Sequence, residues 1–249
     1  MEEEKNKECG CRGGKLVLAS LVLGLCLIAA AVFVSGTIYK IKELGNTLSV
    51  TGSAKEKVTS DAVKWVSNFT RQVLVSDLSS GYSQMKKDQQ AVTGFMKDNG
   101  VGEDEITVSP VFMDQVYKYS ESAPREYVLR QTVEVQSKEV NKITALTKNV
   151  QKLIDEGVVF ATQSLEYYYS KLPEMRVNLL SEAVRDAKAR ADKIAESSGK
   201  KVASVQSASM GVVQVLPPNS VDISDYGSYD TASIEKEVMV TVKAVFKLK

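Results

Sequence analysis

Histidine and cysteine, two side chains that often perform catalysis, are absent from most of this chain. There is no histidine, and the three cysteines, Cys9, Cys11 and Cys26, all lie near the N-terminus. The remaining residues therefore cannot build a Ser-His-Asp or Cys-His nucleophile, a zinc site with His or Cys ligands or a CxxC redox pair. Carboxylate, lysine, tyrosine or Ser-Lys chemistry is left, and no paired-carboxylate motif stands out. We expect no enzyme activity, no metal and no cofactor.

Tyrosines are the most conspicuous candidates for a contact surface. Tyr167, Tyr168 and Tyr169 follow one another within a predicted strand, so the first and third face one way and the second the other. Tyrosine is enriched at protein interfaces, which favours a surface that contacts another copy of the chain. The alternative is a strand that is buried on one side, with hydroxyl groups reaching the surface.

A second candidate is the long loop 217–233, which is rich in Pro, Ser, Asp, Gly and Tyr. Loops of this length are usually either functional or disordered, so we consider both an assembly contact and a mobile surface loop. Its candidate contact residues are Pro217, Pro218, Tyr226 and Tyr229. Asp222, Asp225 and Asp230 lack the spacing of an EF-hand, so we predict no calcium site. Because the loop lies outside the core pattern, deleting 219–230 is expected to leave the fold intact.

These candidates follow an uncharged stretch from Leu16 to Tyr39. A helix of this length covers about 36 Å, which is enough to cross a hydrocarbon core of about 30 Å. A signal peptide has a shorter apolar region and ends at a small-residue cleavage site. Ala29–Ala31 offers such a site, although apolar residues follow it. We therefore predict a retained membrane anchor in contact with lipid through residues 16–39, with a cleaved signal peptide as the alternative.

Charge patterning gives little help with orientation or partners. Four basic residues precede the apolar run and four follow it closely, so the rule that cytoplasmic flanks are positive gives a tie. The size of the C-terminal part favours its export and a single-pass protein of the cell membrane. The predicted organisation is a short cytoplasmic head (1–15), an anchor (16–39), a linker (40–46) and an extracytoplasmic domain (47–249). The net charge of +1 provides no basic field for a nucleic acid.

The hydrophobic periodicity of the exported part alternates between strand and helix. Strands are predicted over 48–58, 61–75, 106–119, 127–137, 158–169, 202–216 and 238–248, with helices over 77–99, 139–155 and 173–198. Pro110 cannot donate to a ladder, so its strand should be an edge or bulged there. The first two strands are predicted to form a hairpin. The fold class is α+β, with a largely antiparallel sheet, helices on one face, and either one domain or two subdomains divided near residue 156.

Three segments resemble those of a known family of exported proteins. They are the opening strand Leu48–Ala54 closed by Val58–Asp61, the helix Leu180–Gly199 with its alanines and Arg190, and the closing strand Val238–Leu248. In this order and spacing they are similar to the SIMPL-domain family, over about residues 47–248. Two departures are Ser60, where the family usually has proline, and Glu126-Tyr127, where a Gly-Tyr pair is usual.

The resemblance implies an α+β domain outside the cytoplasm. It also implies self-assembly into rings or cage-like oligomers and a loose association with envelope stress, without catalytic residues. We therefore expect a self-assembling envelope protein with more than two copies and no catalytic activity. The alternative is an extracytoplasmic binding module that holds a peptide or small apolar ligand between helices and sheet.

Overall fold

The computed structural model describes residues 8–44, 46–117, 124–220 and 224–249. Residues 1–7 of the predicted head, and Asp222 of the loop, lie outside the described residues. The chain is a mixed α+β protein with two largely antiparallel sheets, as the sequence predicts.

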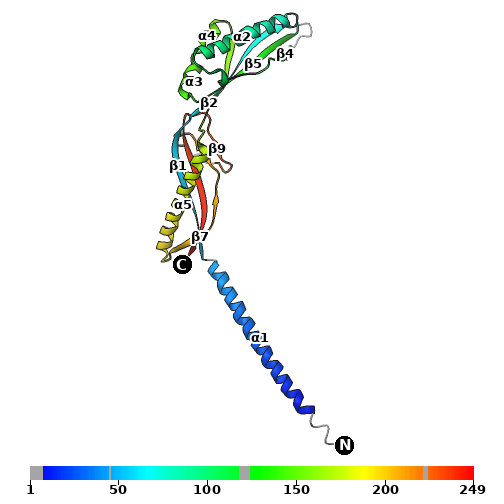
Figure 1. Ribbon diagram of the computed structural model, residues 1–249, viewed down its shortest axis with the longest axis vertical. Coiled ribbons are helices and arrows are strands. Elements are labelled where there is room, and N and C mark those ends of the chain that lie inside the picture. Colours follow the sequence, from blue (N-terminus) through cyan, green and yellow to red (C-terminus); the bar gives the residue numbers. More distant parts are fainter. Residues whose placement is uncertain (1–7, 45, 118–123, 221–223) are drawn as a thin grey trace. The chain divides into compact units, whose positions relative to one another are not determined.

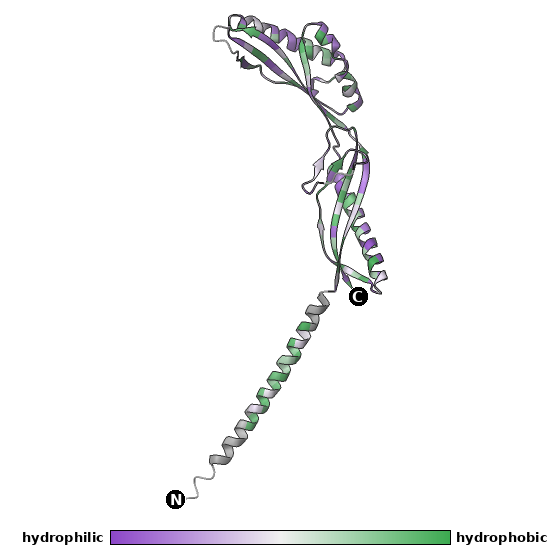
Figure 2. Ribbon diagram, turned by 180° about the vertical axis from the view of Figure 1, so that it is seen from behind, coloured by the Kyte–Doolittle hydropathy of each residue, from purple (hydrophilic) through white to green (hydrophobic). Residues whose placement is uncertain are grey.

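The N-terminal helix α1 spans Glu8–Leu44, so it extends past both ends of the predicted anchor and includes most of the predicted linker. Its segment Ser20–Ile38 is long and apolar enough to cross a membrane, a test that an N-terminal signal sequence passes too. None of that segment is buried against the rest of the protein, and Figure 2 shows apolar residues along its length. A helix that is apolar all round and uncovered by protein needs another apolar environment.

The first sheet is built from consecutive segments in the middle of the chain. Its order is β3-β5-β2-β6, and β4 also pairs with β5. The bounds are β2 (Ala62–Leu74), β3 (Ile106–Val108), β4 (Phe112–Val116), β5 (Glu126–Ser137) and β6 (Val159–Tyr168). The helices are α2 (Leu78–Asp98), α3 (Val140–Thr147) and α4 (Gln151–Asp155), with short 3₁₀ turns at Val75–Asp77 and Glu103–Glu105. Figure 1 shows these three helices on one side of the sheet.

Alternation along β2 and β5 places their apolar residues against these helices. Trp65, Phe69 and Val133 are almost fully buried in a core that also takes in Met85 and Met96 of α2. The predicted helix 139–155 is divided into α3 and α4, because Asn149 leaves the helical path and caps the carbonyl of Ala145 with its side chain. The predicted strand 106–119 is broken around Pro110, as expected of a residue without an N–H group.

A buried ion pair joins β2 to α2. Arg71 donates to both carboxylate oxygens of Asp88, at 2.6 and 2.8 Å, and also to the carbonyl oxygen of Gly157 at 2.8 Å. The Asp88 side chain is only 3% exposed. The hydrogen bond that Arg71 donates to Asp88 raises the pKa of Arg71, burial opposes this effect, and the charge of Asp88 adds to it. Arg71, which interrupts the apolar alternation of β2, thus has a specific partner.

The second sheet contains the first and the last strand of the part of the chain that follows α1. Its order is β1-β10-β8-β9, and β7 also pairs with β10. The bounds are β1 (Thr47–Thr59), β7 (Val202–Met210), β8 (Gln214–Leu216), β9 (Ser228–Tyr229) and β10 (Glu235–Leu248), together with helix α5 (Leu172–Ser197). β9 lies inside the predicted loop 217–233 and pairs in parallel with β8.

The four-residue spacing of alanines along α5 gives the helix a narrow, flat face. Ala183, Ala187, Ala191 and Ala195 are all buried. On β10 the even-numbered residues Val238, Val240, Val242, Ala244 and Phe246 are buried, as their alternation predicts. Small side chains let a helix approach a sheet closely, which explains why alanine occupies the buried stripe of α5.

The predicted hairpin of the first two strands is wrong, because β1 and β2 belong to different sheets. Only Ser60 and Asp61 separate them. The Ser60 N–H donates to the carbonyl of Ile234, and the Asp61 N–H donates to that of Tyr168. A two-residue hairpin needs a primed turn that favours Gly or Asn, and neither residue type occurs here. The chain therefore passes directly from one sheet into the next.

The residues cluster into two compact units, each made of several chain segments. One contains 1–52, 187–209 and 243–249, and the other contains 53–186 and 210–242. The structure does not confirm a subdomain boundary near residue 156, since that position lies within an uninterrupted segment of the second unit.

Candidate functional site

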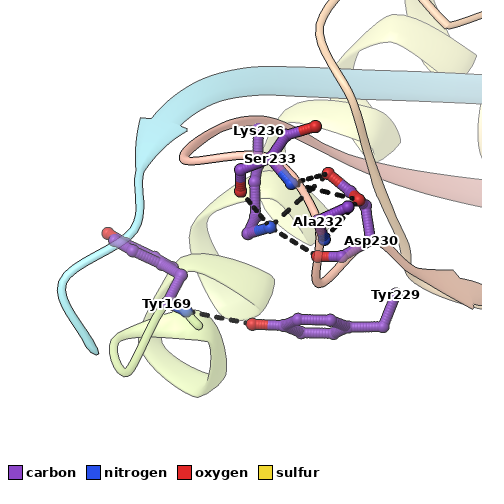
Figure 3. Close-up of polar contacts among 6 residues, drawn as sticks. All are labelled: Tyr169, Tyr229, Asp230, Ala232, Ser233 and Lys236. Atoms are coloured by element: carbon purple, nitrogen blue, oxygen red, sulfur yellow. Dashed lines mark hydrogen bonds and ion pairs between the residues drawn. The ribbon is translucent and has the colours of Figure 1, made fainter. Parts of the chain in front are cut away.

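A buried lysine fixes the end of the long loop. Lys236 is the second residue of β10 and belongs to the same face as Val238 and Val240, where it is 0% exposed. Its ammonium group donates to the backbone carbonyls of Asp230 and Ser233, at 2.5 and 2.6 Å. One oxygen of the Asp230 carboxylate lies 3.5 Å away. A charge buried in this way must be paired and hydrogen-bonded, and Lys236 meets both conditions (Figure 3).

Asp230 stabilises the same turn through its carboxylate and its backbone N–H. Its Oδ1 accepts the backbone N–H of Ala232 at 2.9 Å, and its own N–H donates to the carbonyl of Val215 at 2.8 Å. Burial raises the pKa of Asp230. The hydrogen bonds that its carboxylate accepts from Ala232 and Ser233, together with the charge of Lys236, outweigh that effect, so the pKa is lowered. Burial lowers the pKa of Lys236, and Asp230 opposes that effect. We call the set Asp230, Ser233 and Lys236 the lysine clamp.

The lysine clamp lies beside tyrosines from both candidate regions, residues 167–169 and the loop 217–233. The backbone N–H of Tyr169 donates to the Tyr229 hydroxyl at 3.0 Å (Figure 3). The rings of Tyr168 and Tyr229 lie 5.9 Å apart, and the Lys236 ammonium lies 5.9 Å from the centre of the Tyr229 ring. We call Tyr168, Tyr169 and Tyr229 the tyrosine patch. The structure therefore brings together one part of each region that the sequence singles out.

Tyr168 has the most perturbed titration in this region. Its hydroxyl donates to the carboxylate of Glu166 at 2.5 Å. That hydrogen bond, and then burial, raises the pKa of Tyr168 to about 12. The same bond lowers the pKa of Glu166, so at neutral pH the pair consists of a neutral phenol and a carboxylate. Such a pair fixes the orientation of the Tyr168 ring.

The other candidate residues have different surroundings. Tyr167 is buried, with its hydroxyl 3.0 Å from that of Thr144, and its backbone N–H donates to the carbonyl of Thr231 in the loop. Pro217 is exposed and Pro218 is half-buried, at the turn where Ser220 donates to the Pro217 carbonyl. Neither proline takes part in the described hydrogen bonds or ring contacts of the tyrosine patch.

Tyr226 is the most exposed candidate, at 96%. It borders a groove of about 530 Å³ whose lining is mainly apolar. The lining includes Leu172, Arg176, Met210, Val212, Val213 and Val215, together with Gly227 and Tyr229. Gly227 has a φ of 85° and lies against the Val213 carbonyl, a conformation that favours glycine and turns the chain just after Tyr226. The tip of the loop thus presents an aromatic side chain beside an apolar surface.

These contacts argue against the expectation that deleting 219–230 leaves the fold intact. The segment includes Tyr229 and Asp230, so its deletion would leave a buried lysine without its carboxylate partner. The sequence contained a usable signal for the clamp, because Lys236 stands two residues before Val238 on an alternating apolar face. A lysine in such a position must either disrupt the strand or find buried acceptors.

The chemistry of the site is that of a structural contact. The Lys236 side chain has no exposed surface, and its ammonium group is hydrogen-bonded to two backbone carbonyls. Among the residues that the structure describes, no group of three or more acidic, His or Cys side chains is placed to hold a metal ion. The arrangement therefore holds a loop in one conformation and exposes part of it.

Comparison with known proteins gives one strong finding. The family model SIMPL, described as a protein of unknown function (DUF541), matches residues 48–246. No curated protein matches the chain. Among solved structures, an amidase of the hydantoinase/carbamoylase family from Burkholderia phymatum is similar over 52% of this chain and 35% of its own, with 11% identity and a TM-score of 0.27. That likeness is too low to support any argument about fold or activity.

Proposed function

Because the chain belongs to the SIMPL family, we propose that it is a membrane-anchored envelope protein that assembles with further copies of itself. In this proposal the large domain lies outside the cytoplasm, acts without catalysis and forms a ring or cage-like oligomer, with a role in envelope stress. The absence of histidine and the confinement of cysteine to the first 26 residues support a role other than catalysis.

The observation that carries the assembly proposal is Tyr226, a 96% exposed aromatic residue on a loop that is held at its base. The lysine clamp and the bond between Tyr229 and Tyr169 fix the end of this loop. Fixing the loop beforehand reduces the entropy that binding would otherwise cost. Tyrosine is among the residues that most often dominate interface energies. The apolar groove beside Tyr226 offers a surface that a neighbouring copy can cover.

Anchoring would strengthen such contacts without adding new ones. Copies that are confined to one membrane meet at a high effective concentration, so weak contacts become sufficient for assembly. Helix α1 supports this part of the proposal, since it includes an uncovered apolar segment long enough to cross a bilayer.

The assembly proposal is tested by replacing Tyr226 with alanine in the full-length protein in detergent. Loss of a dominant interface residue weakens binding by at least about 2 kcal/mol, which is roughly thirtyfold. Tyr117→Ala is the matched control, because Tyr117 is 87% exposed and lies outside the loop. Light scattering should show smaller assemblies for Tyr226→Ala alone. A strict monomer for the unmodified protein at high concentration would refute self-assembly.

The anchor is tested separately. Full-length protein should stay with membranes through high-salt and alkaline washes and should retain residues 1–15. Leu25→Arg should impair insertion, because a charge at the centre of a span costs about 2.5–3.5 kcal/mol on insertion scales. A mature N-terminus near Val32 would identify a cleaved signal sequence instead.

A second candidate function is a binding module for a peptide or a small apolar molecule. The groove of about 530 Å³ favours it, because Leu172, Val213 and Val215 offer apolar contacts and Arg176 adds a charge. This candidate predicts a monomer that a ligand stabilises against heat. A ligand-dependent rise in melting temperature, lost in Val213→Asp and kept in Tyr117→Ala, would favour it over assembly.

A further inference from the structure

Strand β7 is an unprotected edge of the second sheet. Among the described residues, β10 is its only strand partner. Lys201, which precedes β7, exchanges both backbone hydrogen bonds with Lys249, so this pairing is antiparallel. On an antiparallel edge strand, alternate residues direct their N–H and C=O groups away from the sheet. β7 therefore presents a row of backbone donors and acceptors to its surroundings.

The usual protection of a sheet edge is missing from β7. From Val202 through Leu216 the sequence contains no charged residue and no proline. The opposite edge of the same sheet, β1, carries Lys55, Glu56 and Lys57. Charged side chains and prolines are the common means by which proteins prevent strands from pairing at an edge. The β1 edge is protected in that way, whereas β7 is not.

The side chains of β7 are uncovered as well. Every residue from Ala203 to Met210 is exposed, although a strand in a folded protein usually buries one of its faces. Val205 and Met210 remain 49% and 48% exposed. The other residues are small or uncharged, so they would not obstruct the approach of another strand. Both the backbone and the side chains of β7 would therefore allow another strand to pair with this edge.

We propose that β7 pairs antiparallel with β7 of a second copy of this chain and continues the sheet across a two-fold axis. A second copy is favoured as the partner because its β7 is uncharged too, so pairing the two β7 strands brings no like charges together. The antiparallel direction follows from Lys200 and Lys201, which lie at one end of the strand only. Antiparallel pairing places them opposite the uncharged residues beyond Met210, whereas parallel pairing would set lysine against lysine, which is unfavourable.

This contact is independent of the one proposed for Tyr226, which lies outside β7. A two-fold contact joins two copies and then closes. Larger assemblies therefore need a second surface, and the loop tip is the candidate for it. The two proposals are separable, because pairing at β7 alone gives a dimer.

A cysteine scan along β7 tests the pairing in the full-length protein. The native cysteines are first replaced (Cys9→Ser, Cys11→Ser and Cys26→Ser), which leaves the chain free of thiols. Single cysteines are then placed at each position from 203 to 209. Directly opposed residues in an antiparallel pair have Cα atoms about 4.5–5.5 Å apart, within the range of about 4.4–6.8 Å that a disulfide requires. Thr51→Cys, at an exposed position of β1, is the matched control.

We expect self-crosslinking to peak at one position near Gln206, where the two-fold axis crosses the strand, and to decline on both sides. Amide hydrogen exchange over 202–210 should slow as protein concentration rises. Crosslinking that is no faster than for Thr51→Cys at every position would overturn the proposal. If assembly that depends on Tyr226 persisted in that case, the proposed function would stand without this contact.

A charge exchange provides the second test. At the position that crosslinks most rapidly, for example Gln206, lysine and glutamate are introduced separately. Each variant alone should associate less strongly, by up to about fivefold, since like charges would then be opposed. A mixture of Gln206→Lys and Gln206→Glu should recover the original association. Equal association of the single variants and the mixture would contradict direct pairing of β7 with itself.

Discussion

Replacing Lys236 with methionine removes the ammonium group but keeps an unbranched side chain of similar length. The lost hydrogen bonds end at the backbone carbonyls of Asp230 and Ser233. Hydrogen bonds to a charged group contribute about 1.5–3 kcal/mol each, so the gross loss is about 3–6 kcal/mol. Methionine also avoids the cost of burying a charge, which is several kcal/mol. We expect a net loss of about 1–3 kcal/mol in the free energy of unfolding, similar to the cost of leaving buried acceptors unpaired.

The assay is denaturant unfolding of the full-length protein in detergent, together with amide hydrogen exchange over 224–233. Lys243→Met is the matched control, because Lys243 lies on the same strand but is exposed. Exchange in the loop should accelerate for Lys236→Met and stay unchanged for the control. Asp230→Asn keeps the acceptor for Ala232 but removes the charge, so combining it with Lys236→Met should cost less than the sum of the two changes. Equal stability and equal loop exchange in Lys236→Met and Lys243→Met would refute the role of the clamp.

Two further predictions concern ionisable pairs in the same chain. Arg71→Ala should lower the free energy of unfolding by about 3–5 kcal/mol, because it leaves the buried Asp88 charge uncompensated, with the Gln84 amide as its remaining side-chain donor; Arg130→Ala, which breaks an exposed pair with Asp114, should cost less than about 1 kcal/mol. Because the pKa of Tyr168 is raised from 10.0 to about 12, its contribution to stability is complete below pH 10 and is lost as the pH rises towards 12. Tyr168→Phe should lack this loss in stability measured against pH, and an identical decline in both proteins would contradict the assignment.

The sequence predicts most elements of this fold because their periodicities are long and regular. The alternation of β10 and the alanine spacing of α5 identify both elements and their buried faces. The hairpin of β1 and β2 is predicted wrongly because adjacency in sequence favours pairing of neighbouring strands. The structure instead uses Ser60 and Asp61 to cross between sheets, and the partners that hold them, Ile234 and Tyr168, are distant in sequence.

The candidate site is predicted in part. Composition alone draws attention to the tyrosines and to the loop, and Tyr168, Tyr169 and Tyr229 do meet. The alternation of a strand shows that Tyr167 and Tyr168 face opposite ways, but it cannot decide which of them meets the core. The lysine clamp depends on backbone carbonyls, whose positions follow from the path of the loop and from no residue type. The sequence therefore indicates the clamp only through Lys236, a lysine at a position where the alternation of β10 predicts an apolar residue.

The assignment of strands to sheets has a consequence for the order in which the chain can fold. The strands of the first sheet lie between residues 62 and 168, so they can pair as soon as that segment has left the ribosome or a translocation channel. The second sheet joins β1 to β10, and the contact between Asn46 and Leu248 spans 202 positions. β1 therefore stays without its strand partner until residues 235–248 have been made. Deleting β10 should therefore disrupt β1 at the beginning of the domain as well as β7 and β8, and pairing over so long a separation in sequence is slow to form.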